Sequence, residues 1–243
     1  MTQPAATAPT VVLVHGAFAD SSSWNGVVSR LQQNSVAVIA AANPLRGLAH
    51  DASYVRDLVA TIDGPVVLVG HSYGGAVITG AAAGADNVKA LVYVAAFLPD
   101  DGESAADLSG KFPGSTLGET LREVPVVLAD GSKATDCYIR NDAFHQQFAA
   151  DVPEDVARIM AVTQRPITAE ALAEKAAGAG AWRALPSWVL VSGGDRNIPP
   201  QAQTFMAERA QARTVNVDAS HAVSVSRPDA VAELIMEAVQ AAS

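Results

Sequence analysis

Six short apolar runs, separated by longer segments of mixed polarity, constrain most strongly what this chain can fold into. They occupy residues 11–14, 36–41, 66–69, 91–95, 188–191 and 215–217. Short continuous apolar runs are typical of strands that are buried on both faces of a parallel sheet. Residues 21–33, 54–62, 76–83, 202–210 and 229–239 have the periodicity of helices that cover such a sheet. The sequence therefore predicts an α/β fold: a doubly wound, mainly parallel sheet of about six strands in a single domain spanning residues 1–243.

The stretch between residues 98 and 186 interrupts this alternation. Residues 153–160 and 169–177 have helical patterns, and the apolar run at 124–128, followed by Asp130-Gly131, indicates a small hairpin. We therefore expect a mostly helical cap, inserted at approximately residues 98–186. Residues 1–9 are rich in Ala, Thr and Pro, which predicts a disordered tail.

A glycine-flanked serine follows the third apolar run. Gly70-His71-Ser72-Tyr73-Gly74 lies between the run that ends at Val69 and a segment with helical character. A serine on a sharp strand-to-helix turn stands clear of the backbone, where a base can reach it. Glycines two positions before and two positions after Ser72 leave room for that turn, since a Cβ there would press on the next element. The pattern predicts that Ser72 is a catalytic nucleophile.

The first apolar run leads into a similar strand-to-loop segment, His15-Gly16-Ala17-Phe18. In acyl-transfer sites built on this layout, a backbone N–H of the loop after an early strand helps to bind the negative oxygen of the tetrahedral intermediate. The N–H of the residue after the nucleophile is its partner. We therefore expect an oxyanion hole formed by the amides of Ala17 and Tyr73.

The base that would activate Ser72 can be sought among five histidines, at positions 15, 50, 71, 145 and 221. The order of catalytic residues in this architecture is nucleophile, acid and then histidine. Of the five, His221 is the one that follows a late strand, because the run at 215–217 directly precedes it. The sequence therefore predicts that His221 is the general base.

Two positions compete for the acid. Asp195 follows the buried run 188–191 and the pair Gly193-Gly194, as a loop carboxylate at the end of a strand should. The alternative is Asp100-Asp101, which follows the strand predicted around residues 91–95 but sits in a Pro-Asp-Asp-Gly turn typical of a plain surface loop. We rank Asp195 first. Replacing each aspartate by asparagine and measuring the activity would show which of the two is the acid.

Four segments together resemble the α/β-hydrolase superfamily over nearly the whole chain. They are residues 11–18 (VVLVHGAF), 67–75 (VLVGHSYGG), 91–102 (LVYVAAFLPDDG) and 192–199 (SGGDRNIP). The third segment resembles the branch that holds plant methylesterases, hydroxynitrile lyases and bacterial pyrethroid-type esterases. This resemblance implies an α/β-hydrolase fold, a triad of Ser72, Asp195 and His221, and oxyanion amides at Ala17 and Tyr73.

Two departures from relatives narrow the expected chemistry. Hydroxynitrile lyases of the branch use a threonine beside the oxyanion loop and a lysine next to the catalytic histidine, whereas this chain has Gly16 and Ala222 at those places. Dehalogenases and epoxide hydrolases of the superfamily place an aspartate at the elbow, where this chain has Ser72. Both departures favour an esterase.

We therefore expect a serine hydrolase, a carboxylesterase that cleaves small or aromatic carboxylic esters through an acyl-enzyme. Two alternatives remain open: an enzyme of the same fold that acts on lactones, C–C bonds or cyanohydrins, and a non-catalytic small-molecule binder. The aromatic and apolar residues expected to line the substrate pocket are Phe18, Phe97, Phe144, Trp182 and Val223.

Composition excludes several other classes of function. The chain has 16 Lys and Arg against 25 Asp and Glu, a formal net charge of −9, which disfavours nucleic-acid binding. Its single cysteine, Cys137, allows no intrachain disulfide. No metal-ligand spacing is present, so we expect neither a metal nor a cofactor. No apolar stretch reaches the ~20 residues of a membrane helix, and residues 1–9 lack the pattern of a signal peptide, so we expect no membrane association and a cytoplasmic protein. The sequence leaves the oligomeric state open, a homodimer included.

Overall fold

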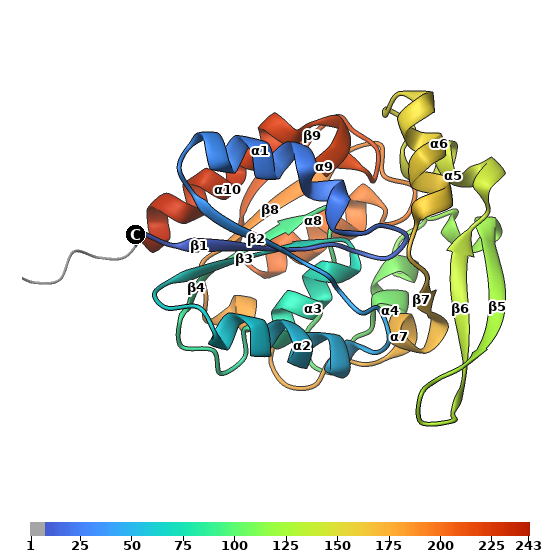
Figure 1. The fold of residues 1–243 in the computed structure, drawn as a ribbon, viewed down its shortest axis with the longest axis horizontal. Coiled ribbons are helices and arrows are strands. Elements are labelled where there is room, and N and C mark those ends of the chain that lie inside the picture. The colour runs from blue at the N-terminus through green and yellow to red at the C-terminus, as the bar shows by residue number, and fades with distance from the viewer. Residues whose placement is uncertain (1–7) are drawn as a thin grey trace, which may run out of the picture.

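A computed structural model describes residues 8–243. Its centre is a sheet of six parallel strands in the order β2-β1-β3-β4-β8-β9 (Figure 1), which confirms the predicted fold class. The strands are β1 (Thr10–Val14), β2 (Ala37–Ala41), β3 (Val66–His71), β4 (Val88–Val94), β8 (Ser187–Ser192) and β9 (Arg213–Val217). Residues 1–7 of the predicted disordered tail lie outside the described residues, and residues 8 and 9 lead directly into β1.

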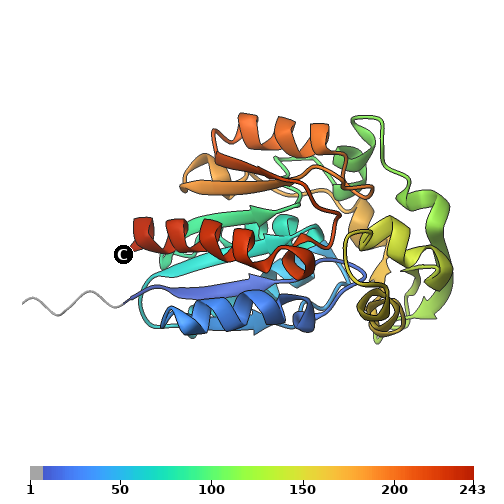
Figure 2. The same ribbon diagram turned by 90° about the horizontal axis from the view of Figure 1, so that it is seen from above.

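Helices cover both faces of this sheet. One face is covered by α1 (Asn25–Gln33) and α10 (Pro228–Ala242), together with the short helices η1 (Ser21–Trp24) and α9 (Val223–Ser226). The other face is covered by α2 (Leu48–Ala60), α3 (Tyr73–Ala81) and α8 (Pro200–Arg209). Figure 1 shows helices above and below the sheet, and Figure 2 looks onto the face that α1 and α10 cover.

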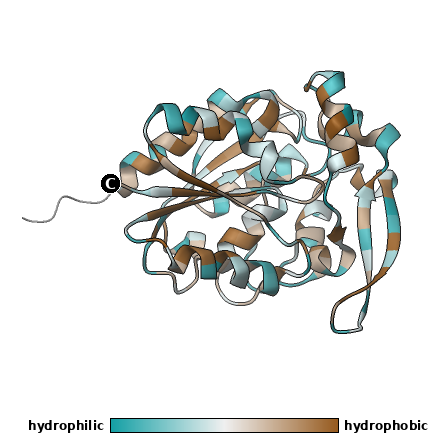
Figure 3. Cartoon of the chain, in the orientation of Figure 1, coloured by the Kyte–Doolittle hydropathy of each residue, from teal (hydrophilic) through white to brown (hydrophobic). Residues whose placement is uncertain are grey.

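Alternation of side chains along the strands explains why the apolar runs have no polar face. Val11 and Leu13 of β1 belong to the core under α1 and α10, whereas Val12 and Val14 belong to the core under α2 and α3. Successive side chains of a strand point to opposite faces, so a strand with helices on both sides must be apolar at every position. The brown strands at the centre of Figure 3 show this continuous apolar character.

Between β4 and β8 the chain first forms a layer beyond the carboxyl ends of the central strands, and residues 181–183 then return beside α3 (Figure 1). It contains the helices α4 (Ala105–Gly110), α5 (Asn141–Phe148), α6 (Glu154–Thr163) and α7 (Ala169–Ala173), and the short 3-10 helices η2 (Leu117–Thr120) and η3 (Ala181–Arg183). It also contains a three-stranded antiparallel sheet of β5 (Leu121–Val127), β6 (Lys133–Ile139) and β7 (Ile167–Thr168). The small hairpin expected at residues 124–128 is thus part of a longer pair of strands.

Polar contacts fasten this layer to the rest of the molecule. The Glu174 carboxylate accepts hydrogen bonds from the Leu48 and Ala49 N–H groups, at 2.5 and 3.1 Å, and so caps the start of α2. Arg46 donates to Asp136 of β6 at 2.5 Å and to the Pro166 carbonyl at 2.9 Å. Helix N-termini leave N–H groups without intrahelical partners, so the carboxylate supplies what the local sequence at Gly47 does not.

The end of α10 and the start of β1 lie at the opposite end of the molecule from this layer (Figure 1). Among the residues that the structure describes, no helix combines the length and the apolar character needed to cross a membrane. The same residues hold no cluster of three or more His, Cys, Asp or Glu side chains suited to a metal ion.

Candidate active site

Ser72 lies on the tight turn between β3 and α3. Its φ of 54° and ψ of −124° fall in a region that residues with a Cβ rarely adopt. A Cβ on Gly74 would lie 2.3 Å from the Val14 carbonyl oxygen, and one on Gly70 would lie 2.5 Å from the carbonyl oxygen of Gly74. The two flanking glycines are therefore required by the close approach of backbone to backbone, and the turn has the geometry of a nucleophile elbow.

The loop after β1 packs directly against this serine. A Cβ on Gly16 would lie 2.6 Å from the Ser72 Cβ and 3.2 Å from its Oγ. The next residue, Ala17, makes no hydrogen bond through its N–H within residues 8–243. Tyr73 is the first residue of α3, where N–H groups have no acceptor inside the helix. The two amides expected at an oxyanion hole thus flank Ser72 with no competing intrahelical partner.

Buried side chains hold the two amide-bearing segments in place. The Asn43 N–H donates to His15 Nε2 at 3.0 Å, so His15 carries its proton on Nδ1, which donates to the Gly16 carbonyl at 2.9 Å. Burial lowers the pKa of His15 and keeps the ring neutral. The Tyr73 hydroxyl donates to the buried Asp51 carboxylate at 3.0 Å, and its pKa is raised, chiefly by burial.

Asp195 and His221 meet beyond the ends of β8 and β9. His221 Nδ1 and Asp195 Oδ2 are 2.6 Å apart, and both side chains are almost completely buried. An ionised carboxylate only accepts hydrogen bonds, so Nδ1 carries the proton and Nε2 is left with a free lone pair. A histidine in this tautomer can act as a general base.

Four donors saturate the Asp195 carboxylate. Oδ1 accepts from the N–H groups of Asn197 and Ile198 at 2.7 and 3.0 Å, and Oδ2 accepts from Gln203 Nε2 at 2.8 Å as well as from His221. Gln203, in α8, was not foreseen from the sequence, because a glutamine eight positions after the acid has no local signature. These bonds fix the carboxylate in the orientation that holds His221.

The two alternative carboxylates, Asp100 and Asp101, bind other partners. Asp100 forms an ion pair with Arg183, whose hydrogen bond lowers the pKa of that carboxyl, and Asp101 accepts from the Gly178 N–H at 2.8 Å. Neither is hydrogen-bonded to His221. Of the two positions weighed from the sequence, the structure pairs the histidine with Asp195.

His71 connects the turn that bears Ser72 to the loop that bears His221. Its Nε2 is 2.8 Å from the His221 carbonyl oxygen, and the two imidazole rings are 4.7 Å apart between centroids. Burial lowers the pKa of His71 to about 3, so the ring is neutral and donates through Nε2. Ser72 is the next residue. His221 Nδ1 is bonded to Asp195, and within residues 8–243 no hydrogen bond joins Ser72 Oγ to the His221 imidazole.

The layer between β4 and β8 also supports the histidine loop. The Phe148 carbonyl accepts from the Ala222 N–H at 2.9 Å, and Asp151 accepts from the Ser220 hydroxyl at 2.5 Å. The Phe148 ring meets the His221 ring edge to face at 5.0 Å. This support was not predicted, because it depends on contacts across about 70 residues of sequence, as for Asp151 and Ser220.

A cavity of about 310 Å³ adjoins Ser72. The core contributes Ala17, Phe18, Tyr73 and Phe97 to its wall, and the layer between β4 and β8 contributes Leu117, Leu121 and Leu172, among others. Phe18 and Phe97 thus lie where the sequence analysis expected pocket residues. The three leucines were not foreseen, because apolar residues in an insertion cannot be assigned to core or cavity without the tertiary packing.

Three other expected pocket residues lie elsewhere and need correction. Phe144 is fully buried and stacks on Phe148 at 5.0 Å. Trp182 donates its indole N–H to the Pro99 carbonyl at 3.0 Å and packs under arginine side chains. Val223 is fully buried in the core beneath α10. Each fills internal packing space, which is the more frequent use of large apolar side chains.

Comparison with known proteins identifies the family. The family model described as alpha/beta hydrolase matches residues 11–234, nearly the whole chain. The chain therefore belongs to the α/β hydrolase family, which confirms the resemblance noted from the sequence.

Similar proteins carry esterase names. A carbendazim hydrolyzing esterase of Nocardioides sp. (strain SG-4G) is 34% identical over 113 residues, which cover 41% of this chain and 47% of that protein. The crystal structure of polyneuridine aldehyde esterase has a TM-score of 0.80 and 17% identity, covering 95% of this chain and 99% of the other. A pyrethroid hydrolase from Sphingobium faniae JZ-2 has a TM-score of 0.76 and 20% identity, covering 96% and 98%. At these identities the two structures establish the fold.

Proposed function

We propose that this protein is a serine esterase that hydrolyses small or aromatic carboxylic esters through an acyl-enzyme, with Ser72 as nucleophile, His221 as general base and Asp195 as its orienting acid. The observation that carries the proposal is the buried 2.6 Å contact between His221 Nδ1 and Asp195 Oδ2. It fixes the tautomer that leaves Nε2 free to accept a proton. The esterase names of similar proteins support the same reaction class.

In the proposed mechanism, His221 Nε2 takes the proton of Ser72 Oγ as this oxygen attacks the ester carbonyl. The carbonyl π electrons move to oxygen, and the amides of Ala17 and Tyr73 donate hydrogen bonds to the oxyanion. The position of Tyr73 at the N-terminus of α3 adds the favourable end of the helix dipole. Asp195 stays ionised and stabilises the imidazolium.

The tetrahedral intermediate then collapses by breaking the bond to the alcohol oxygen, which receives the proton from His221 Nε2. Ser72 is left acylated. A water molecule that gives its proton to the same nitrogen attacks the acyl carbonyl, and the second collapse returns the proton to Ser72 Oγ and releases the carboxylic acid. No cofactor is needed for either half-reaction.

The apolar wall of the Ser72 cavity supports an apolar acyl group rather than a charged one. The proposed enzyme is a single domain in which residues 98–186 act as a cap that supplies part of this wall and shields the cavity from bulk solvent. The small volume of the cavity favours compact or aromatic acids.

The proposal is tested with a fluorophosphonate probe and a Ser72→Ala variant. Wild-type protein should be labelled covalently at Ser72, and the alanine variant should lose ester hydrolysis by more than ~10³-fold while keeping its circular dichroism spectrum. A panel of p-nitrophenyl esters, aryl methyl esters, lactones and cyanohydrins identifies the bond that is cleaved. A folded wild type that is neither labelled nor active, or an active Ser72→Ala variant, would disprove the assignment.

A further inference from the structure

The wall of the Ser72 cavity is mostly apolar, but Asn197 contributes a primary amide to it. Asn197 lies in the loop between β8 and α8, two residues after Asp195, and is only 3% exposed. A buried amide normally has hydrogen-bond partners for both its oxygen and its nitrogen. The partners of Asn197 therefore decide whether the cavity offers a hydrogen bond to a ligand.

Hydrogen bonds fix the backbone of Asn197. Its N–H donates to Asp195 Oδ1 at 2.7 Å, and its carbonyl accepts from the hydroxyls of Ser109 and Ser115 at 3.1 and 2.9 Å. Both serines line the same cavity. Because a serine has a single O–H, neither of them has a second proton to donate into the cavity.

Gln147 of α5 determines the orientation of the Asn197 amide. Gln147 Nε2 donates to the Arg196 carbonyl at 2.9 Å, and a carbonyl oxygen only accepts, so the nitrogen of Gln147 must lie there. The same nitrogen is 2.7 Å from Asn197 Oδ1, a position where a second nitrogen would have no bond to make. Gln147 is 5% exposed, and its oxygen accepts from the Thr116 hydroxyl at 2.8 Å. Asn197 Nδ2 therefore lies on the side of its amide that does not face Gln147.

Asn197 Nδ2 makes no hydrogen bond within residues 8–243, but it is not sealed inside the protein. Because Asn197 lines the Ser72 cavity, Nδ2 can donate to a group in that cavity. The other side-chain donors of the wall, apart from Ser72, have acceptors: the Tyr73 hydroxyl donates to Asp51, and the two serine hydroxyls donate to the Asn197 carbonyl. Nδ2 is thus a fixed donor that no group of the described chain uses.

The charges around Nδ2 favour a neutral acceptor over an anion. The described residues that line the cavity include no Lys or Arg. The buried carboxylate of Asp195 is bonded to the N–H of Asn197 itself. An anionic group beside Nδ2 would be repelled by this carboxylate and would have no opposite charge to pair with. An ether, carbonyl or hydroxyl oxygen of a neutral molecule avoids both costs.

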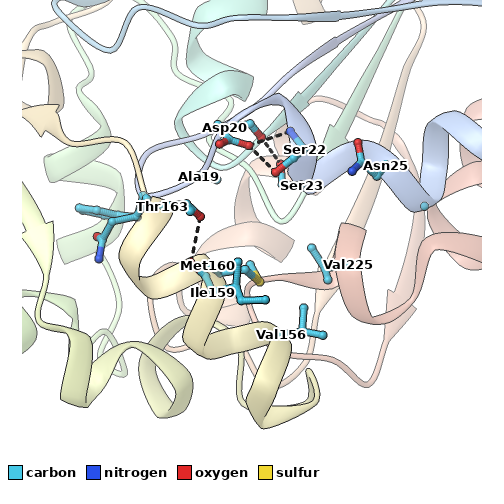
Figure 4. Close-up of a pocket in the computed structure, with 13 residues that line it drawn as sticks. Ala19, Asp20, Ser22, Ser23, Asn25, Val156, Ile159, Met160, Thr163 and Val225 are labelled. Atoms are coloured by element: carbon cyan, nitrogen blue, oxygen red, sulfur yellow. Dashed lines mark hydrogen bonds between the residues drawn. The ribbon is translucent and has the colours of Figure 1, made fainter.

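A groove of about 300 Å³ between α6 and residues 19–26 offers no comparable position (Figure 4). None of Ser72, Tyr73 and His221 lines this groove. Figure 4 shows that its hydroxyl groups are bonded within their own walls, those of Ser22, Ser23 and Thr163. We therefore place the recognition of a polar substrate group in the Ser72 cavity.

We propose that Asn197 is a specificity-determining residue whose Nδ2 donates a hydrogen bond to a second, neutral oxygen of the substrate. The preferred substrates are then compact esters that carry an ether, carbonyl or hydroxyl oxygen in the part that occupies the Ser72 cavity. This inference rests on the proposed esterase function, since the recognised oxygen belongs to an ester that Ser72 attacks. A substrate with a methylene group in place of this oxygen leaves Nδ2 without an acceptor, and a site that leaves a buried donor unpaired discriminates against such a substrate.

The test uses matched esters in which one methylene is exchanged for one ether oxygen. In the acid, methyl methoxyacetate is paired with methyl butanoate, and methyl 3-methoxypropanoate with methyl pentanoate. In the alcohol, 2-methoxyethyl acetate is paired with butyl acetate. The measured quantity is the oxygen preference, which is kcat/KM for the ether divided by kcat/KM for its hydrocarbon partner. A general loss of catalysis affects both members of a pair and cancels in this ratio.

Two variants remove the donor. Asn197→Leu does so at similar side-chain size, and Asn197→Ala is the second variant in case the branched side chain disturbs folding. Both keep the backbone N–H that binds Asp195. Ser115→Ala is the matched control, because it removes a hydroxyl from the same wall that is bonded to the same residue, but leaves Nδ2 in place. Circular dichroism spectra establish that each variant is folded.

We expect both Asn197 variants to lower the oxygen preference about three- to tenfold in at least one pair, as for the loss of one neutral hydrogen bond, and Ser115→Ala to leave it within about twofold of wild type. A fall in an acid pair places the recognised oxygen in the acid, and a fall in the alcohol pair places it in the alcohol. The proposal is overturned if the preference is unchanged in all three pairs, or if Ser115→Ala lowers it as much as the Asn197 variants do. Failure of the underlying function looks different: wild-type protein would hydrolyse no member of any pair and would not be labelled by the fluorophosphonate at Ser72.

Discussion

The hydrogen bonds of Gln203 offer a quantitative test of how the acid is held. This fully buried side chain of α8 donates to Asp195 Oδ2 at 2.8 Å and to the Ile198 carbonyl at 2.8 Å, and it accepts from the Ser192 N–H at 3.0 Å. The substitution Gln203→Met keeps the length and unbranched shape of the side chain but removes all three bonds. The change thus separates hydrogen bonding from packing.

The cost of the substitution follows from those three contacts. A hydrogen bond to a charged group contributes about 1.5–3 kcal/mol and a neutral one about 0.5–1.5 kcal/mol, so Gln203→Met should lower the free energy of unfolding by about 2.5–6 kcal/mol. In a domain of this size that corresponds to a fall in Tm of roughly 5–24 °C. Asp195 keeps three other donors, so the histidine contact persists with looser orientation, and kcat/KM should fall about 10- to 100-fold.

Thermal unfolding followed by circular dichroism, together with ester hydrolysis at a temperature where both proteins are folded, measures the two effects. Gln201→Met on the same helix is the control, because Gln201 is exposed and should tolerate the change. If Gln203→Met kept a Tm within about 2 °C of wild type, the value assigned to buried hydrogen bonds would be refuted for this site. If it lost stability but kept full activity, Gln203 would have no part in orienting the acid.

Other substitutions test the acid assignment and the lone thiol. Asp195→Asn should lower kcat/KM by about 10³–10⁴-fold, because an amide favours the wrong histidine tautomer, whereas Asp100→Asn should leave it unchanged; comparable losses in steady-state assays would reverse the assignment. Because its bond to Arg183 lowers the pKa of Asp100, that pair stabilises the fold at neutral pH and loses its effect as the pH falls, so the Tm difference between wild type and Asp100→Asn should shrink in acid. Burial raises the pKa of Cys137 to about 11, so iodoacetamide at pH 8 should label it slowly in the folded protein and quickly in urea; fast labelling of native protein would contradict its burial.

The central strands could be predicted closely because burial on both faces leaves a continuous apolar signature. Each of the six runs overlaps a strand, and no boundary differs by more than three residues. The run at 91–95 is an example. The strand β4 ends at Val94, because the next residue, Ala95, has a φ of 44° and is no longer extended. Such end effects depend on the loop that follows, which the run itself does not encode.

Elements that depend on distant residues were predicted less well. The sequence placed the second helix at residues 54–62, but α2 begins at Leu48, because Glu174 supplies the cap that Gly47 lacks. Likewise, α7 ends at Ala173, because the backbone of Glu174 is extended and its carboxylate binds the start of α2. Long-range capping leaves no local pattern.

In the candidate site, too, some residues could be predicted from the sequence and others could not. Ser72, Asp195 and His221 could be selected because turn glycines, strand ends and chain order are local signals. Their supports could not, since Gln203 and Phe148 act through contacts that form only when the chain is folded.

The position of the chain ends has a practical consequence. The end of α10 and the start of β1 lie at the far end of the molecule from the layer between β4 and β8 (Figure 1). A bead, an affinity handle or a fused fluorescent protein attached after Ser243 would therefore project away from the layer between β4 and β8. Immobilised protein should turn over substrate at the rate of the free protein, limited by diffusion through the support alone.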